Sequence, residues 1–118
     1  VETHITDVRT VSVGVGDQDR ALEFYVDKLG FETRLDVPMG EGNRWIEVAA
    51  PGAATSIALV ANGESMPSGA DTGIRFTSGD VEADHTDLQA RGVDVDDVLR
   101  WEGVPPMFSF RDQDKNLL

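Results

Sequence analysis

The chain has 118 residues, no cysteine and a formal net charge of −12 from 22 acidic and 10 basic residues. This length fits one domain, and the lack of cysteine excludes disulfides and thiolate chemistry. The negative field repels phosphate backbones, so we expect no nucleic-acid partner. We also expect a cytoplasmic protein with no membrane partner, because no run approaches the about 20 apolar residues of a membrane span and the N-terminus shows no signal pattern.

The first predicted elements are a strand, a helix and three further strands. Alternating apolar residues predict the strand over 11–15. Asp17 is typical of a helix N-cap, and Gly30 of the residue that ends the helix. The following strands are expected at 31–37, 44–50 and 55–61, with a long, turn-rich connection over 38–43.

The same order of elements then returns. A stretch rich in Gly, Ser and Pro, 62–71, is predicted to be a linker. Asp80 is a second predicted N-cap, here of a helix that ends near Gly92. The strands of this half are expected at 72–78, 93–101 and 106–111, with a last strand lacking where the sequence stops. Repetition at such a period indicates two half-domains packed about a pseudo-twofold axis.

Two motifs carry a resemblance to a known family. The run from Asp17 to Phe31, with its Phe-Tyr and Leu-Gly-Phe spacing, resembles the opening module of the glyoxalase/bleomycin-resistance/dioxygenase family, the vicinal oxygen chelate superfamily. The run from Asp112 to Asn116 is similar to the family's closing turn, with Gln113 and Lys115 in place of its usual Pro and Gly. The resemblance covers nearly the whole chain.

This resemblance implies an α+β fold. Two β-α-β-β-β modules, here 1–61 and 72–118 of a single domain, form a U-shaped mixed sheet around a cavity, with the helices on the outer face. It also implies a homodimer whose small-molecule site lies between modules or subunits.

Many relatives implied by the resemblance bind a divalent metal through four strand positions. Three of these positions match Thr10, Ala58 and Gly73, and the fourth would follow the last residue. Such ions need converging imidazole, carboxylate or amide donors, and neither His4 nor His85 matches a ligand position. We therefore expect no metal and no other cofactor. Extradiol dioxygenase chemistry, which needs two histidines and a carboxylate, is disfavoured.

Strand parity selects residues that can line the cavity, since alternate side chains share a face. An aromatic platform with a few polar groups suits a small ligand, either cationic or aromatic. The candidate ligand-binding residues are Thr10, Ser12, Trp45, Glu47, Arg75 and Trp101.

Structural alternatives remain for these candidates. Trp45 can instead pack beneath the 38–43 connection, and Trp101 can serve as a packing anchor for the nearby Pro105-Pro106 turn. Glu47 and Arg75 can form an ion pair between the halves.

Two functions follow from the sequence. The first is a metal-free protein of the bleomycin-resistance kind that sequesters a compound without chemistry. The second is a glyoxalase-like lyase or isomerase in which Glu47 is the base and Arg75 stabilises the enediolate. A third reading, a subunit with a purely structural role, has no positive support.

Overall fold

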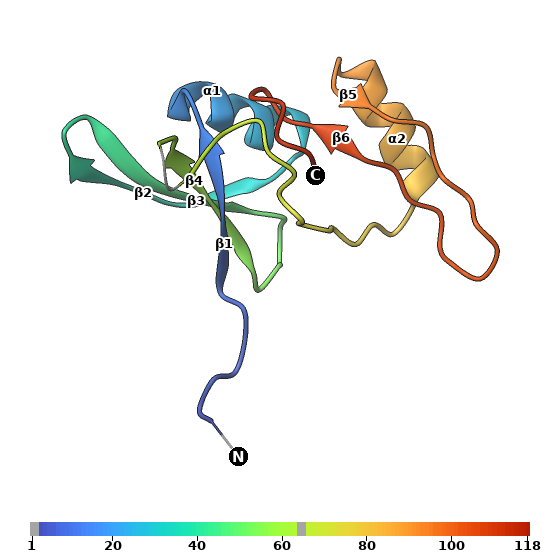
Figure 1. Ribbon diagram of the computed structural model, residues 1–118, viewed down its shortest axis with the longest axis horizontal. Helices are drawn as coiled ribbons and strands as arrows, with labels where there is room; N and C mark the ends of the chain where they lie inside the picture. Colours follow the sequence, from blue (N-terminus) through green and yellow to red (C-terminus); the bar gives the residue numbers. More distant parts are fainter. Residues whose placement is uncertain (1–2, 64–65) are drawn as a thin grey trace.

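The computed structural model describes residues 3–63 and 66–118 (Figure 1). Four strands form a mixed sheet in the order β1-β4-β3-β2, and β5 and β6 form a second, antiparallel pair. The predicted α+β class is therefore confirmed. The elements in chain order are β1 (Thr10–Val15), α1 (Gln18–Leu22), the π-helix η1 (Glu23–Lys28), β2 (Glu32–Gly40), β3 (Asn43–Ala49), β4 (Ser56–Ala61), α2 (Val81–Ala90), β5 (Asp94–Val95) and β6 (Phe110–Arg111).

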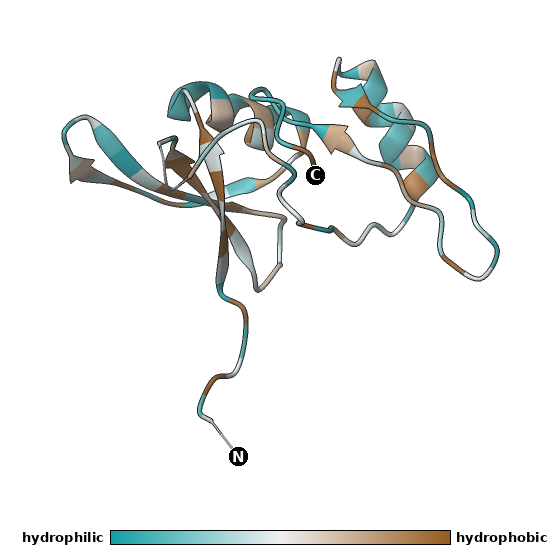
Figure 2. Ribbon diagram, in the orientation of Figure 1, coloured by the Kyte–Doolittle hydropathy of each residue, from teal (hydrophilic) through white to brown (hydrophobic). Residues whose placement is uncertain are grey.

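One face of the four-stranded sheet packs against α1 and η1. β1 runs parallel to β4, and the other pairs are antiparallel. The core is apolar, as the brown stretches of β1, β3 and β4 in Figure 2 show. Burying these side chains provides the main driving force for folding. The buried residues of this face and of the two helices are Val13, Val15, Ala21, Phe24, Tyr25, Ile46, Val48, Ile57 and Leu59.

The predicted helix caps are confirmed. Asp17 accepts hydrogen bonds from the backbone N–H groups of Asp19 at 3.0 Å and Arg20 at 3.2 Å. Gly30 follows the first helix with a φ of 77°, which suits a residue without a Cβ. The helix is nevertheless not uniform, because it widens from α to π geometry at Glu23.

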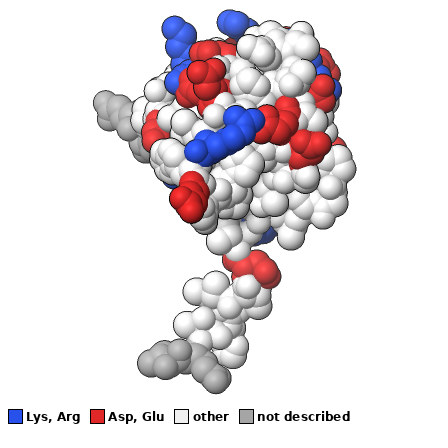
Figure 3. Space-filling model, turned by 90° about the vertical axis from the view of Figure 1, so that its right-hand side faces the viewer, with Lys and Arg blue, Asp and Glu red and all other residues white. Residues whose placement is uncertain are grey.

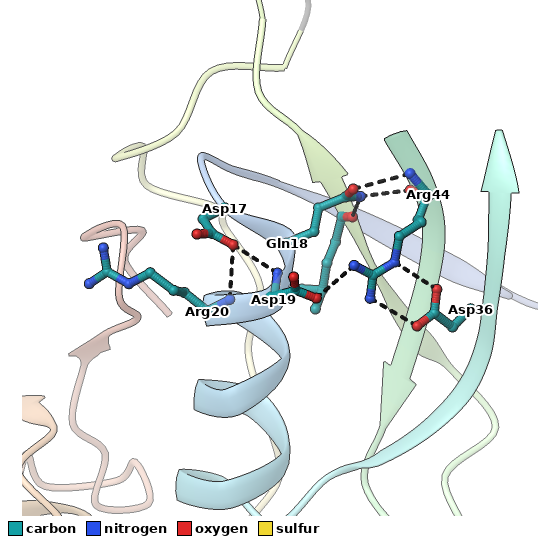
Figure 4. A network of polar contacts seen from close by, with 7 residues as sticks. Asp17, Gln18, Asp19, Arg20, Asp36 and Arg44 are labelled. Carbon is teal, nitrogen blue, oxygen red and sulfur yellow. Dashed lines mark hydrogen bonds and ion pairs between the residues drawn. The ribbon is translucent and has the colours of Figure 1, made fainter. Parts of the chain in front are cut away.

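A polar network attaches the start of α1 to the sheet (Figure 4). The Gln18 Nε2 donates to the carbonyls of Arg44 at 2.6 Å and Leu59 at 2.9 Å, and its Oε1 accepts from the Arg44 N–H at 3.1 Å. The Arg44 guanidinium reaches Asp19 at 2.6 Å and Asp36 at 3.0 Å. These bonds raise the pKa of Arg44 and lower that of Asp36. The helix start is thus held to β2, β3 and β4.

The long connection predicted over 38–43 is wrong. β2 continues through Pro38 to Gly40, and β3 begins at Asn43, so only Glu41 and Gly42 form the turn. Glu41 has a φ of 55° and Gly42 a φ of 80°. Positive φ at both central residues matches the twist of paired strands, which is why such short hairpins form.

The strands of the second half are shorter than predicted. Residues 72–78 form no strand. The predicted strands 93–101 and 106–111 are reduced to β5, β6 and two isolated bridges, one between Leu99 and Met107 and one between Arg111 and Leu117. Side-chain alternation indicates a half-buried surface, but a strand also needs a hydrogen-bonded neighbour. At the start of this segment the Thr72 N–H donates to the Leu117 carbonyl at 3.1 Å, but residues 73–78 make no backbone–backbone hydrogen bond in the part of the chain that the structure describes. Residues 1–2 of the predicted first module and 64–65 of the predicted linker 62–71 lie outside the described residues.

The closing turn connects the end of the chain to the first helix and β1. Asp112 is buried and accepts hydrogen bonds from the Tyr25 hydroxyl at 2.8 Å and the Asn116 N–H at 2.9 Å. Burial first, and then the adjacent Asp112 charge, raise the pKa of Tyr25 well above its usual value. The Asn116 side chain donates to the Gly14 carbonyl at 2.8 Å. After the turn, Leu118 exchanges backbone hydrogen bonds with Phe110.

Besides the closing turn, a reciprocal pair of hydrogen bonds links the halves. Lys28 donates to the Arg91 carbonyl at 2.6 Å, and Arg91 donates to the Lys28 carbonyl at 2.7 Å, across 63 positions of sequence. Beside them runs an aromatic row, in which the Phe31 and Phe76 rings lie 5.6 Å apart and the Phe76 and Phe110 rings 6.1 Å apart. No helix in the described ranges is long and apolar enough to cross a membrane.

Candidate functional site

The candidate site lies on the sheet face turned away from α1 and η1, which we call the helix-free face. Register and parity place on it the residues Thr10, Ser12, Leu35, Val37, Trp45, Glu47, Ser56 and Ala58. At its Gly14 end the face is covered, since a Cβ on Gly14 would lie 2.5 Å from the Pro67 carbonyl oxygen. The remaining part of the face is where predicted site residues converge.

Glu47 is the polar centre of this face. It is only 4% exposed. The donors around it come from its own strand β3, from strands β4 and β1 of the same sheet and from the residue before β1. Its oxygens accept hydrogen bonds from the Trp45 indole at 2.8 Å, the Ser56 hydroxyl at 2.7 Å and the Thr10 hydroxyl at 3.4 Å. Arg9 forms an ion pair with it at 3.3 Å. The Trp45 hydrogen bond, followed by those of Ser56 and Arg9, lowers the pKa of Glu47.

The expected ion pair between Glu47 and Arg75 is wrong. Parallel pairing places Thr10 opposite Ser56, so Arg9, immediately before Thr10, reaches Glu47 instead. Arg75 is exposed, and it makes no ion pair within the described residues.

The remaining candidates are not brought to one point. Ser12 is exposed on the helix-free face opposite Ala58. Trp101 lies in the second half and is 62% exposed. It is therefore not buried as a packing anchor for the Pro105-Pro106 turn would be. Thr10, Trp45 and Glu47 are therefore the sequence candidates that the structure places in direct contact.

Sequence reasoning missed the residues that complete the site. A cavity of 220 Å³ opens beside Glu47, lined by Arg9, Arg34, Leu35, Glu47, Ala54 and Ser56. Ser56 shares strand parity with Ala58, a signal that was available. Arg34 was not predictable by parity, because a register shift between Thr33 and Leu35 interrupts the alternation of β2.

An apolar stripe borders the cavity on β2. Leu35 is 37%, Val37 42% and Met39 61% exposed. Val37 lies opposite Trp45 in the sheet register. Because the Trp45 N–H is bonded to Glu47, the indole is fixed in orientation and presents an apolar surface beside this stripe.

The residues at the positions matched to metal ligands do not fit a divalent cation. The Thr10 hydroxyl is within hydrogen-bonding distance of Ser56 at 2.9 Å, Ala58 has no donor atom, and Gly73 has no side chain. Within residues 3–63 and 66–118, no three His, Cys, Asp or Glu side chains are grouped so as to hold a metal. His85 instead lies 2.9 Å from the Asp96 carbonyl through its Nε2.

A family comparison agrees with the fold and the motifs. The model of the glyoxalase/bleomycin resistance protein/dioxygenase superfamily matches residues 4–118. The chain belongs to this superfamily. Protein YetH of Bacillus subtilis is 31% identical over an alignment of 119 positions, which covers 96% of this chain and 95% of YetH.

Solved structures of the superfamily are also similar. The antibiotic-binding protein TnmS3 from Streptomyces sp. CB03234 has 38% sequence identity and a TM-score of 0.88, covering 98% of this chain and 94% of TnmS3. A superfamily member from Sphaerobacter thermophilus has 30% identity and a TM-score of 0.89, covering 98% of this chain and 95% of its own.

Proposed function

We propose that the protein binds a small aromatic molecule on its helix-free face, without a metal and without chemical conversion. The observation that carries this proposal is the fixed Trp45 indole, which lies beside the exposed stripe of Leu35, Val37 and Met39 and next to a small cavity with both polar and apolar lining residues. Apolar surface with a few placed polar groups is typical of ligand sites. The similarity to an antibiotic-binding protein supports the same conclusion.

An enzyme that uses Glu47 as its base is the weaker proposal. A general base needs a free oxygen and a pKa near the working pH. Both Glu47 oxygens already accept hydrogen bonds, and its pKa is lowered by Trp45, Ser56 and Arg9. The partner expected to stabilise an enediolate, Arg75, is not paired with Glu47. We therefore favour binding over catalysis.

We further propose that the protein acts as a homodimer, with the site closed by a second copy. Large apolar side chains are exposed on both halves, and contiguous patches of this kind commonly mark interfaces. Those outside the apolar stripe are Ile5, Val8, Phe76, Leu99, Trp101, Val104 and Met107.

Tryptophan fluorescence tests the binding proposal. We expect a planar aromatic probe such as anthracene-9-methanol to quench emission saturably in the wild type and in Trp101→Phe. In Trp45→Phe, quenching should largely disappear and the affinity measured by calorimetry should fall. The probe should be recovered unchanged. Absence of saturable binding would refute the proposal, as would stoichiometric conversion of the probe; a stoichiometric divalent metal in the purified protein would refute the metal-free part.

A further inference from the structure

The charges at the helix-free face differ from those of the whole chain. The chain carries a net −12, and on the side shown in Figure 3 acidic and basic side chains are interspersed. The cavity beside Glu47, in contrast, has Arg9 and Arg34 in its lining against the single carboxylate of Glu47. The lining itself therefore holds two guanidinium groups and one carboxylate, and a second carboxylate, Glu32, pairs with Arg34 from outside the lining.

Arg9 lies directly beside the aromatic surface. Its Nη1 and the Trp45 Nε1 both donate to the same atom, the Oε2 of Glu47, at 3.3 Å and 2.8 Å. One oxygen therefore brings a guanidinium and an indole together. A ligand ring stacked on Trp45 would carry its substituents close to Arg9.

Arg9 also retains donors for a ligand. A guanidinium has five N–H groups, and the hydrogen bonds of Arg9 in the described part of the chain, to Thr10 and Glu47, both use Nη1. Its side chain is 74% exposed. The Nε and Nη2 groups therefore remain available in a geometry that suits the two oxygens of a carboxylate.

Arg34 plays a different part because its donors are occupied. It donates to the backbone carbonyls of Ala53 and, at 3.1 Å, Ala50. Its Nε also forms an ion pair with Glu32 at 3.5 Å. Arg34 is therefore held at the wall of the cavity with its charge largely balanced, and Arg9 is the guanidinium that keeps donors for a ligand. Glu47, the only carboxylate in the cavity lining, is already paired with Arg9.

We infer that the preferred ligand is a planar aromatic molecule that carries an anionic oxygen group, and that Arg9 determines this preference. The inference rests on the proposed binding function and makes it specific. Of the two ligand types expected from the sequence, cationic or aromatic, it retains the aromatic one and proposes an anionic group in place of a cationic one, although the net charge of the whole chain is negative. The net charge governs the long-range approach of a ligand, whereas the contact groups act at short range with little screening.

Three matched probes test the inference: anthracene-9-carboxylate, anthracene-9-methanol and 9-(aminomethyl)anthracene, the last as its ammonium. Titrations at neutral pH and physiological ionic strength should give the tightest Kd for the carboxylate and the weakest for the ammonium. We expect the two charged probes to differ by about tenfold, since attraction of one adds to repulsion of the other and each exposed ion pair contributes modestly.

Variants at Arg9 identify the residue responsible. Arg9→Gln should reduce the ratio between the charged probes to about twofold or less, and Arg9→Lys should retain most of the preference. Arg100→Gln, which removes a guanidinium that pairs with Glu82 in the second half, should leave the ratio unchanged. Thermal unfolding checks that each variant is folded. If Arg9→Gln does not fold, two measurements on the wild type test the inference instead. The carboxylate should bind more tightly than the ammonium, and this difference in Kd should disappear at high salt.

The outcomes separate this inference from the proposed function. An ammonium probe that binds as tightly as the carboxylate, or an Arg9→Gln variant with unchanged preference, would overturn the inference alone. No saturable binding of any of the three probes would overturn the proposed function itself.

Discussion

Glu47 keeps its charge in a buried position because donors replace the water that it loses on folding. Sequence parity placed it correctly on the same face as Trp45. Parity cannot show which cation reaches it, since Arg9 is adjacent only through the parallel pairing of β1 with β4. Arg75 was chosen from the sequence by side-chain alternation in the predicted strand 72–78, but no strand forms there to present it.

The lowered pKa of Glu47 predicts a pH-dependent contribution to stability. A carboxylate whose folded pKa is depressed stabilises the protein above its unfolded pKa and loses this effect as the pH falls through the folded value. The free energy of unfolding of Glu47→Gln, from urea titrations, should be lower than that of the wild type at pH 7 by about 1–3 kcal/mol.

This difference should shrink as the pH falls below about 4.5, the ordinary value for the group. Exposed Glu102→Gln is the matched control and should show no such trend. A difference for Glu47→Gln that is constant with pH would contradict the account.

Lys115 has an unusual backbone conformation. It has a φ of 64°, in the left-handed region that favours glycine. Its side chain is exposed, so replacing lysine by glycine should remove few stabilising contacts. Lys115→Gly should relieve strain of about 1–2 kcal/mol but increase the entropy of the unfolded chain by up to about 1 kcal/mol.

We therefore expect a small net gain in the midpoint of urea unfolding for Lys115→Gly. Lys115→Val, whose branched side chain tolerates this φ poorly, should lower the midpoint. A lower midpoint for the glycine variant would show that Lys115 makes a stabilising contact that outweighs the strain.

At the scale of elements, the sequence predicted what depends on local chemistry. The Asp17 and Asp80 caps and the β3 alternation around Trp45 are local, and all appear in the structure. The hairpin turn after β2 was missed at the sequence level because Pro38 and two glycines are typical of a loop. The same glycines also suit a tight turn, since both adopt a positive φ. The change to π geometry at Glu23 has no signal that we can identify in the sequence.

The closing turn gives a prediction about how elements are joined. Tyr25→Phe removes the 2.8 Å hydrogen bond from η1 to buried Asp112 and leaves that oxygen with fewer donors. The free energy of unfolding should fall by about 1–3 kcal/mol. Thr55→Val also removes a 2.8 Å hydrogen bond, from the Thr55 hydroxyl to the Val8 carbonyl, but at an exposed position where water can replace it. It should change the free energy of unfolding by no more than about 0.5 kcal/mol. Equal effects of the two variants would mean that the turn does not anchor the helix.

At the scale of the whole molecule, the repeated sequence pattern leads to unequal halves. The reciprocal contact of Lys28 and Arg91 joins corresponding helix ends, as expected for a pseudo-twofold relation. Among residues 3–63 and 66–118, the first half forms a four-stranded sheet and the second half a two-stranded one. Strand pairing depends on partners distant in sequence or in another chain, and side-chain alternation carries no information about them.

The proposed dimer predicts the effect of a charge on the helix-free face. Val37 is 42% exposed there, so Val37→Glu would place an unpaired carboxylate in the interface and raise the dimer dissociation constant by at least about tenfold. Thr86→Glu, on the exposed side of α2, makes the same charge change elsewhere and should have little effect. Light scattering at micromolar concentration measures both. A wild-type monomer under these conditions would contradict the proposal.

The edge strand β2 restricts how such an assembly can grow. Every residue of β2 is exposed, but Pro38 lacks an N–H group and two register shifts interrupt the strand. Unpaired edges recruit further strands, and proline and bulges prevent this. These features protect the exposed edge from open-ended β-sheet polymerisation. If the protein binds a ligand as proposed, it can keep its apolar side chains exposed for that ligand, and association can stop at the proposed dimer.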